Sequence, residues 1–201
     1  MKRHGMIFNA EMVRAILDGR KTQTRRMVKP QPPEGSQLWG MPKVWDNKRN
    51  LIFWREGDRS NYGKPLPIEV GDIIWVRETW SKLPSGNLWY RADNHPINDG
   101  WWTPSIHMPR WASRIDLEVT AVRVERVQEI SEEDAKKEGV ESVKYGNETF
   151  WKAYGSNPLP EGGELVATRD AKRSFGCLWQ SIYANWDANP WVWVYEFRRV
   201  K

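Results

Sequence analysis

The apolar positions of this chain follow helical spacing in two short stretches and the two-residue spacing of strands in five others. The first helix is predicted to begin after Asn9, an N-cap residue type, and to end at Gly19. The second covers residues 175–183. A further short helix opens at Ser131 with the capping pattern Ser-x-x-Asp and ends at Gly139. The predicted strands cover residues 6–8, 22–28, 73–77, 114–127 and 191–200.

The longest strand pattern, residues 114–127, changes phase in its middle. Apolar residues alternate up to Val119 and continue on the other parity from Val122, so we expect a β-bulge or sharp bend near Thr120 and Ala121. Strands bent in this way are typical of small closed barrels. The last strand is apolar on both faces where it begins, which indicates a central strand. The sequence therefore predicts an α+β fold built on a small β-barrel with flanking short helices.

Three segments between these elements lack a clear period and are rich in loop-forming residues. They cover residues of about 30–68, 81–112 and 141–173. We interpret them as loop-rich insertions in a single domain that spans residues 1–201. Trp101 and Trp102 stand together in the second insertion and are hard to bury completely, so they are candidates for stacking or for a lid over the core.

The composition adds a hint of a nucleic-acid partner. The chain has 14 tryptophans, and an excess of this kind fits a protein that stacks nucleobases, although a Trp-rich core is an equal alternative. The formal net charge of +5 permits a polyanionic partner without requiring one. RNA, DNA or a modified nucleoside are the expected ligands.

Other classes of site and location are excluded by what the sequence lacks. Cys177 is the single cysteine, so no internal disulfide or cysteine-based zinc cluster can form, and the three histidines lack metal-ligand spacing. We therefore expect no metal and no cofactor. No run of 18 apolar residues is present, and the basic N-terminus is not followed by an apolar segment. The sequence thus favours a cytoplasmic protein without a membrane partner.

The stretch from Gly19 to Arg26 concentrates side chains that bind anions or handle protons. Arg20 lies at the expected helix C-terminus, where the helix dipole favours a cation. In the following strand, Thr24 and Arg26 share one face and Arg25 lies on the other. Lys21 and Thr24 are three positions apart, so they can meet only if Lys21 lies in the turn before the strand.

Glu138 is the last residue of the predicted short helix, where its carboxylate opposes the helix dipole. Local helix energetics do not explain this residue. A cationic partner elsewhere in the chain would explain it, and plain solvent exposure is the alternative.

The sequence Gly19-Arg20-Lys21-Thr22-Gln23-Thr24-Arg25-Arg26 resembles the Gly-x-Lys-Thr-x-Thr-x-Arg signature of the ASCH domain family, part of the PUA-like superfamily. Supporting similarities cover about half of the chain and lie at residues 70–72, 117–120, 130–139 and 193–197. Residues 76–80 and 189–193 resemble the Trp-rich members of this family that are common in phages and prophages.

The resemblance implies a small PUA-like barrel with a cleft between barrel and helices, and links the chain to RNA or nucleotide binding. Small bacterial members are amidohydrolases that deacetylate acetylated cytidine with a Lys, a Thr and a Glu, which match Lys21, Thr24 and Glu138 here. The motif arginine matches Arg26, and another branch is associated with RNA cleavage. The three insertions depart from the family pattern and bear on which substrate the cleft accepts.

Four hypotheses follow. The first is a binding module for nucleic acid, RNA first, or for a modified nucleoside, in a basic cleft lined by tryptophans. The second is an amidohydrolase with Thr24 as nucleophile, Lys21 as a base whose pKa is lowered by burial, and Glu138 as acid and base. The third is a nuclease that uses the same cluster, and the fourth is a scaffold with a solvated basic face. The expected ligand-binding residues are Arg20, Arg25, Arg26, Arg77, Glu78, Trp80, Trp101 and Trp102.

Overall fold

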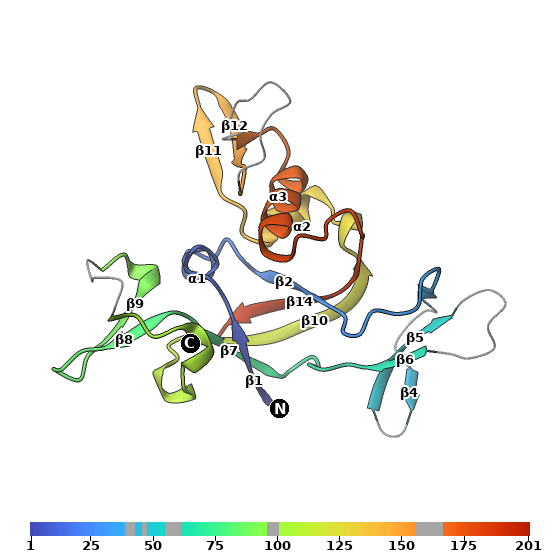
Figure 1. Cartoon of the computed structure of the whole chain (residues 1–201), viewed down its shortest axis with the longest axis horizontal. Helices are drawn as coiled ribbons and strands as arrows, with labels where there is room; N and C mark the ends of the chain where they lie inside the picture. Colours follow the sequence, from blue (N-terminus) through green and yellow to red (C-terminus); the bar gives the residue numbers. More distant parts are fainter. Residues whose placement is uncertain (39–42, 46–47, 55–61, 96–100, 156–166) are drawn as a thin grey trace.

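A computed structural model describes residues 1–38, 43–45, 48–54, 62–95, 101–155 and 167–201 of the chain. Its centre is a five-stranded sheet with the strand order β1-β7-β10-β14-β2 (Figure 1). β1 and β7 are parallel, and the other neighbours are antiparallel. The strands of this sheet are β1 (Arg3–Ile7), β2 (Gln23–Met27), β7 (Ile73–Arg77), β10 (Asp116–Arg126) and β14 (Trp191–Arg199).

Two predicted features of this sheet are confirmed. The pairing of β10 with β14 shifts register between Val119 and Ala121, where the sequence predicted a bulge or bend. β14 lies between β10 and β2, and its first five residues are all buried, as the apolar pattern on both faces indicated. The helices pack on the surface formed by the long strands β10 and β14.

The expected closed barrel is wrong. The sheet ends at β1 and β2, and these two strands do not pair with each other among the described residues. Instead, Arg26 Nη2 donates to the carbonyl oxygen of Ile7 at 2.6 Å, and its guanidinium lies 5.1 Å from the ring centre of Phe8. A side chain of one edge strand therefore bonds to a backbone carbonyl of the other edge strand, in place of strand pairing at this seam.

The three helices begin at side-chain caps. Asn9 accepts from Met12 N at 2.8 Å to open α1 (Ala10–Leu17), and Ser131 accepts from Asp134 N at 3.1 Å to open α2 (Glu132–Lys137). α3 (Ala171–Tyr183) begins four residues before the predicted pattern because Asp170 caps it by accepting from the backbone of Arg173.

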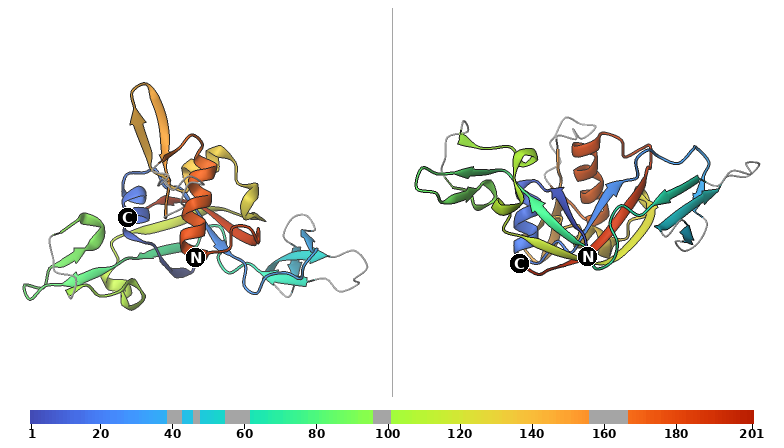
Figure 2. Two further views of the ribbon diagram at one scale, coloured as in Figure 1. Left: turned by 45° about the horizontal axis from the view of Figure 1, so that its top comes forward. Right: turned by 90° about the horizontal axis from the view of Figure 1, so that it is seen from below.

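α2 and α3 lie together on one face of the sheet (Figure 2). The carboxylate of Glu132 accepts from the first two backbone N–H groups of α3, each at 2.9 Å. This contact fixes the N-terminus of α3 on α2, where the helix dipole favours a negative charge. Phe175, Leu178 and Trp179 of α3 then pack with Val192 and Val194 of β14 in one apolar cluster.

The predicted insertions form three lobes around the central sheet (Figure 1). The first lobe holds β3 (Gln37–Leu38), β4 (Lys43–Trp45), β5 (Lys48–Trp54) and β6 (Tyr62–Pro65). The second holds β8 (Trp80–Lys82), β9 (Leu88–Tyr90), η1 (Arg91–Asp93), η3 (Ser105–His107) and η4 (Arg110–Ala112). The third holds β11 (Ser142–Tyr145), β12 (Glu148–Lys152) and β13 (Ala167–Thr168), and η5 (Val127–Glu129) follows β10. None of the described helices is long and apolar enough to span a membrane.

Candidate functional site

Lys21 lies in the turn between α1 and β2 and is fully buried. Its Nζ donates to Glu138 twice, to the carbonyl oxygen at 2.7 Å and to Oε2 at 2.8 Å. Gly139 makes this approach possible, because a Cβ at its position would lie 2.8 Å from the Cβ of Lys21, and its φ of +85° is unfavourable for other residues. The cationic partner predicted for Glu138 is therefore present.

The environment of Lys21 shifts its proton affinity. Burial lowers the pKa of Lys21 from its ordinary value of 10.5, while the charge and hydrogen bond of Glu138 act in the opposite direction. A buried lysine with a lowered pKa is a feature of general bases, and also of purely structural ion pairs.

Glu138 is shared with a second buried cation from the neighbouring strand. Arg25 Nη1 donates to Glu138 Oε1 at 2.9 Å, its Nε donates to Glu125 Oε1 at 3.0 Å, and its Nη2 pairs with Asp134 at 3.2 Å. Arg123 extends these contacts at the edge of the cluster, since it binds the same Glu125 and Asp134. We call the whole set the charge network, which consists of Lys21, Arg25, Arg123, Glu125, Asp134, Glu138 and Glu196.

The charge network satisfies its own charges. Its seven members are three cations and four carboxylates, and Lys137, whose Nζ lies 3.8 Å from Asp134 Oδ1, adds a fourth cation at its edge, so the charges balance. The side chains of Lys21 and Arg25 are completely inaccessible to solvent. Although Arg25 was expected to bind a ligand, the structure uses its guanidinium inside the protein.

Thr24 lies beside the network, on a small cavity beneath α3. The cavity is about 20 Å³ in volume, which is room for about one water molecule. The nearby Nε of Arg26 is buried and has no hydrogen-bond partner in the described part of the chain. The cavity is lined by Met12, Thr24, Arg25, Arg26 and Glu138 from below and by Phe175, Leu178, Trp179, Ile182 and Tyr183 of α3 from above.

The structure thus brings two of the three proposed catalytic residues into direct contact and the third only near them. Lys21 contacts Glu138, and Glu138 and Thr24 line the same cavity. No hydrogen bond joins Lys21 to Thr24 among the described residues, and Lys21 does not line the cavity. The arrangement places the buried carboxyl of Glu138, the hydroxyl of Thr24 and space for one water together, and α3 covers them.

Arg20 lies outside this buried site. Its guanidinium donates to the Gly139 carbonyl at 3.2 Å and to Asp18 at 3.1 Å, and its side chain is 40% exposed. Neither contact is to a carbonyl of α1, so the structure gives Arg20 internal partners other than the helix end that was predicted for it.

Three further predicted ligand-binding residues, which flank β7 and begin the second lobe, make internal contacts. Arg77 donates to the carbonyl of Ile106, and Trp80 is only 8% exposed. Glu78 is buried and accepts from Arg114 Nε at 2.9 Å. Burial raises the pKa of Glu78, although the hydrogen bond and charge of Arg114 act against this shift.

The second lobe also carries an exposed aromatic surface. Trp101 and Trp111 are 59% and 63% exposed, and Ile106 is similarly open. Lys82 Nζ lies 5.7 Å from the ring centre of Trp111, whose edge packs on the buried Trp80. We call Lys82, Trp101, Ile106 and Trp111 the tryptophan surface. Nothing in the sequence distinguishes Trp111 from the other tryptophans, because its exposure depends on the packing of this lobe.

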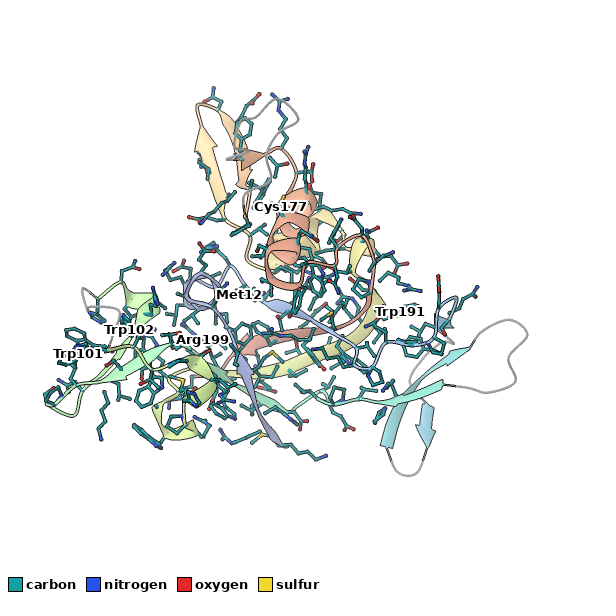
Figure 3. All side chains as sticks on the ribbon, viewed as in Figure 1. Met12, Trp101, Trp102, Cys177, Trp191 and Arg199 are labelled. Carbon is teal, nitrogen blue, oxygen red and sulfur yellow. The ribbon has the colours of Figure 1, made fainter. Side chains whose placement is uncertain are left out.

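The tryptophan surface is separate from the Thr24 cavity. In Figure 3, Trp101 and Trp102 lie at the end of the second lobe, while Met12, which lines the cavity, lies at the centre of the molecule. Trp102 is partly buried. The single Trp-lined cleft that the sequence suggested is therefore divided between two places.

The described residues give no indication of a metal site, since no three His, Cys, Asp or Glu side chains among them form a group that could hold an ion. Comparison of the chain with protein families, curated proteins and solved structures found no match.

Proposed function

We propose that this protein binds single-stranded nucleic acid, RNA in preference to DNA, through the tryptophan surface of its second lobe. The observation that supports this proposal is the exposure of Trp101 and Trp111 on the same lobe, with the cation Lys82 over the ring of Trp111. Exposed aromatic rings stack on bases of any sequence, and nearby cations attract the phosphate backbone. The net charge of +5 adds a favourable long-range attraction.

Membership of the ASCH family and a PUA-like origin of the sheet are part of this proposal. They rest on the resemblance of residues 19–26 and on the position of that stretch between α1 and β2, beside a buried glutamate. In this proposal the charge network is a structural element that joins β2 to α2, and the second lobe contacts the bound nucleic-acid strand.

The proposal is tested by titrating fluorescently labelled RNA and DNA strands of about twelve nucleotides, a length within the range bound by single-stranded-binding folds. We expect binding that weakens strongly between about 50 mM and about 200 mM salt, because phosphate contacts release counterions. A double-stranded competitor should compete poorly, since its bases are already stacked. Absence of binding at the lower salt concentration would refute the proposal.

A second candidate function, deacetylation of acetylated cytidine, is favoured by one observation. Lys21, with its lowered pKa, contacts Glu138, and Glu138 shares a cavity with Thr24. In this scheme Thr24 Oγ1 attacks the acetyl carbon while its proton passes to Glu138 and on to Lys21. The proton returns through Glu138 to the leaving amine of cytidine, and water then hydrolyses the acetyl-Thr24 ester to acetate. A cavity of about 20 Å³ cannot hold a nucleoside, so α3 has to move for substrate to enter.

Incubation of the protein with acetylated cytidine, followed by separation of the nucleosides, tests this candidate. Release of cytidine that is lost in both Thr24→Val and Lys21→Ala would support it. Release that persists in Lys21→Ala, or no release at all, would reject it without affecting the proposed strand binding.

A further inference from the structure

A cavity among the described residues lies on the outer side of α3, away from the Thr24 cavity. Its volume is about 510 Å³, within the range of about 300–1,000 Å³ that is typical of small-molecule sites. In Figure 3, Cys177, which lies on this cavity, is on α3 in the upper middle of the view, while Trp101 lies at the far left. We call this cavity the α3 groove, and its lining consists of Asp170, Lys172, Arg173, Gly176, Cys177, Gln180, Trp186 and Asp187.

One wall of the α3 groove is a firmly held indole. The ring of Trp186 lies 3.3 Å from the point that a Cβ of Gly176 would occupy, so a side chain at that position would push the ring away. The backbone N of Trp186 donates to Gln180 Oε1 at 2.9 Å, and its carbonyl accepts from Gln128 Nε2 at 2.9 Å. The aromatic wall is therefore in place before any ligand arrives, which reduces the entropy cost of binding.

The cations of this groove are available to a ligand. The exposed side chains of Lys172 and Arg173 form no ion pair with any residue that the structure describes. A smaller cavity of about 330 Å³ beside α1 provides the contrast, because there Arg20 pairs with Asp18, and Lys152 pairs with two glutamates. Cations that are already paired gain little from an anionic ligand, whereas unpaired ones gain a charge-assisted hydrogen bond.

The carboxylates of the α3 groove do not cancel this preference. Asp170 caps α3 and accepts from the backbone N of Arg173, so its charge is held by the helix N-terminus. Asp187 is exposed at the other end of the lining, and Gln180 lies between. The groove thus offers an aromatic wall, two cations, and separate groups that accept hydrogen bonds.

We propose that the α3 groove binds a mononucleotide, with its heteroaromatic base against Trp186 and its single phosphate at Lys172 and Arg173. Asp187 supplies an acceptor for an exocyclic amino group of the base, and Gln180 Oε1, which already accepts from Trp186 N, has a second lone pair for the same role. This site is distinct from the tryptophan surface and does not depend on strand binding there.

Cys177 provides a direct test because it is the single cysteine of the chain and lies in the groove, partly accessible. The rate at which a thiol reagent alkylates Cys177 is measured with and without AMP. At an AMP concentration of about ten times Kd, occupancy is expected to slow alkylation about tenfold. Adenosine and inorganic phosphate, added separately, should each protect only at higher concentration.

Variants assign the protection to the groove. In the double variant Lys172→Glu/Arg173→Glu, AMP protection should disappear, and the ratio of rates with and without AMP is compared within each variant because Arg173 lies near the thiol. Lys82→Glu, on the second lobe, should keep full protection. No protection by AMP at millimolar concentration, protection by phosphate alone as strong as by AMP, or protection that survives the double variant would each overturn the proposal.

Discussion

The charge network and the tryptophan surface both contain the residue types of a nucleic-acid site, and the structure uses them in opposite ways. In the network, Lys21 and Arg25 are buried and each is bound to a carboxylate. On the surface, Trp101 and Trp111 are open to solvent, and Lys82 lies over one of the rings. The difference shows that the partners of a basic run, more than its charge, decide whether it can bind a ligand.

The largest effect is expected from Glu138→Ala. The change removes the carboxylate that two buried cations share, and uncompensated buried charges typically cost about 3–5 kcal/mol of unfolding free energy. Urea unfolding monitored by circular dichroism measures the loss. Glu133→Ala is the matched control on the same helix, since Glu133 is exposed and its loss should change stability by at most about 0.5 kcal/mol. Equal stabilities for the two variants would mean that the network does not hold α2 to β2.

Trp101→Ala and Trp111→Ala are expected to weaken nucleic-acid binding. Removal of a stacked ring costs about 1–3 kcal/mol of binding free energy per base, so strand affinity should fall about fivefold to a hundredfold or more. Unfolding free energy should stay nearly constant for Trp101→Ala because that ring is exposed. Val143→Ala, an exposed apolar residue of the third lobe, is the control and should bind like the natural chain. If all three variants bind nucleic acid with the same affinity, the nucleic-acid strand contacts another surface of the protein.

The predictable part of the molecule is the part whose signals are local. The caps at Asn9 and Ser131 and the phase change between Val119 and Ala121 each need only a few neighbouring residues to be recognised. Glu138 was also informative, because its conflict with its own helix dipole indicated a partner from elsewhere.

The unpredictable part depends on residues far apart in the sequence. Arg25 bonds to Glu125 and Glu138, which are 100 and 113 positions away in the sequence. Its internal role could therefore not be predicted from its motif. The contact across the open seam is of the same kind, since Arg26 bonds to the carbonyl of Ile7 on a strand that is not its neighbour in the sheet. Side-chain contacts of this kind follow from the fold and leave no pattern in the sequence.

A smaller effect is expected on the pH dependence of stability, which involves Lys21 of the charge network and not the tryptophan surface. The pKa of Lys21 in the folded chain lies below its ordinary value of 10.5. Between these two values the unfolded chain holds more protons than the folded chain, so the stability that Lys21 contributes rises with pH. The unfolding free energy of the natural chain minus that of Lys21→Met should therefore increase as the pH rises towards 10.5, by at most about 1.4 kcal/mol per pH unit. A difference that is constant or falls over this range would contradict the assigned direction.

The smallest effect is expected from Thr24→Val, which tests what fills the cavity beneath α3. The cavity has room for about one water, and Arg26 Nε is a buried donor nearby without a described partner. A water held between Thr24 and Arg26 would satisfy both groups, and loss of its bond to the hydroxyl should cost about 0.5–1.5 kcal/mol of unfolding free energy. Thr24→Ser, which keeps the hydroxyl, is the control for that bond. If Thr24→Val is instead more stable than the natural chain, the cavity is dry and the hydroxyl is a cost to the fold. Because Thr24 is far from the tryptophan surface, strand affinity should be unchanged in both variants.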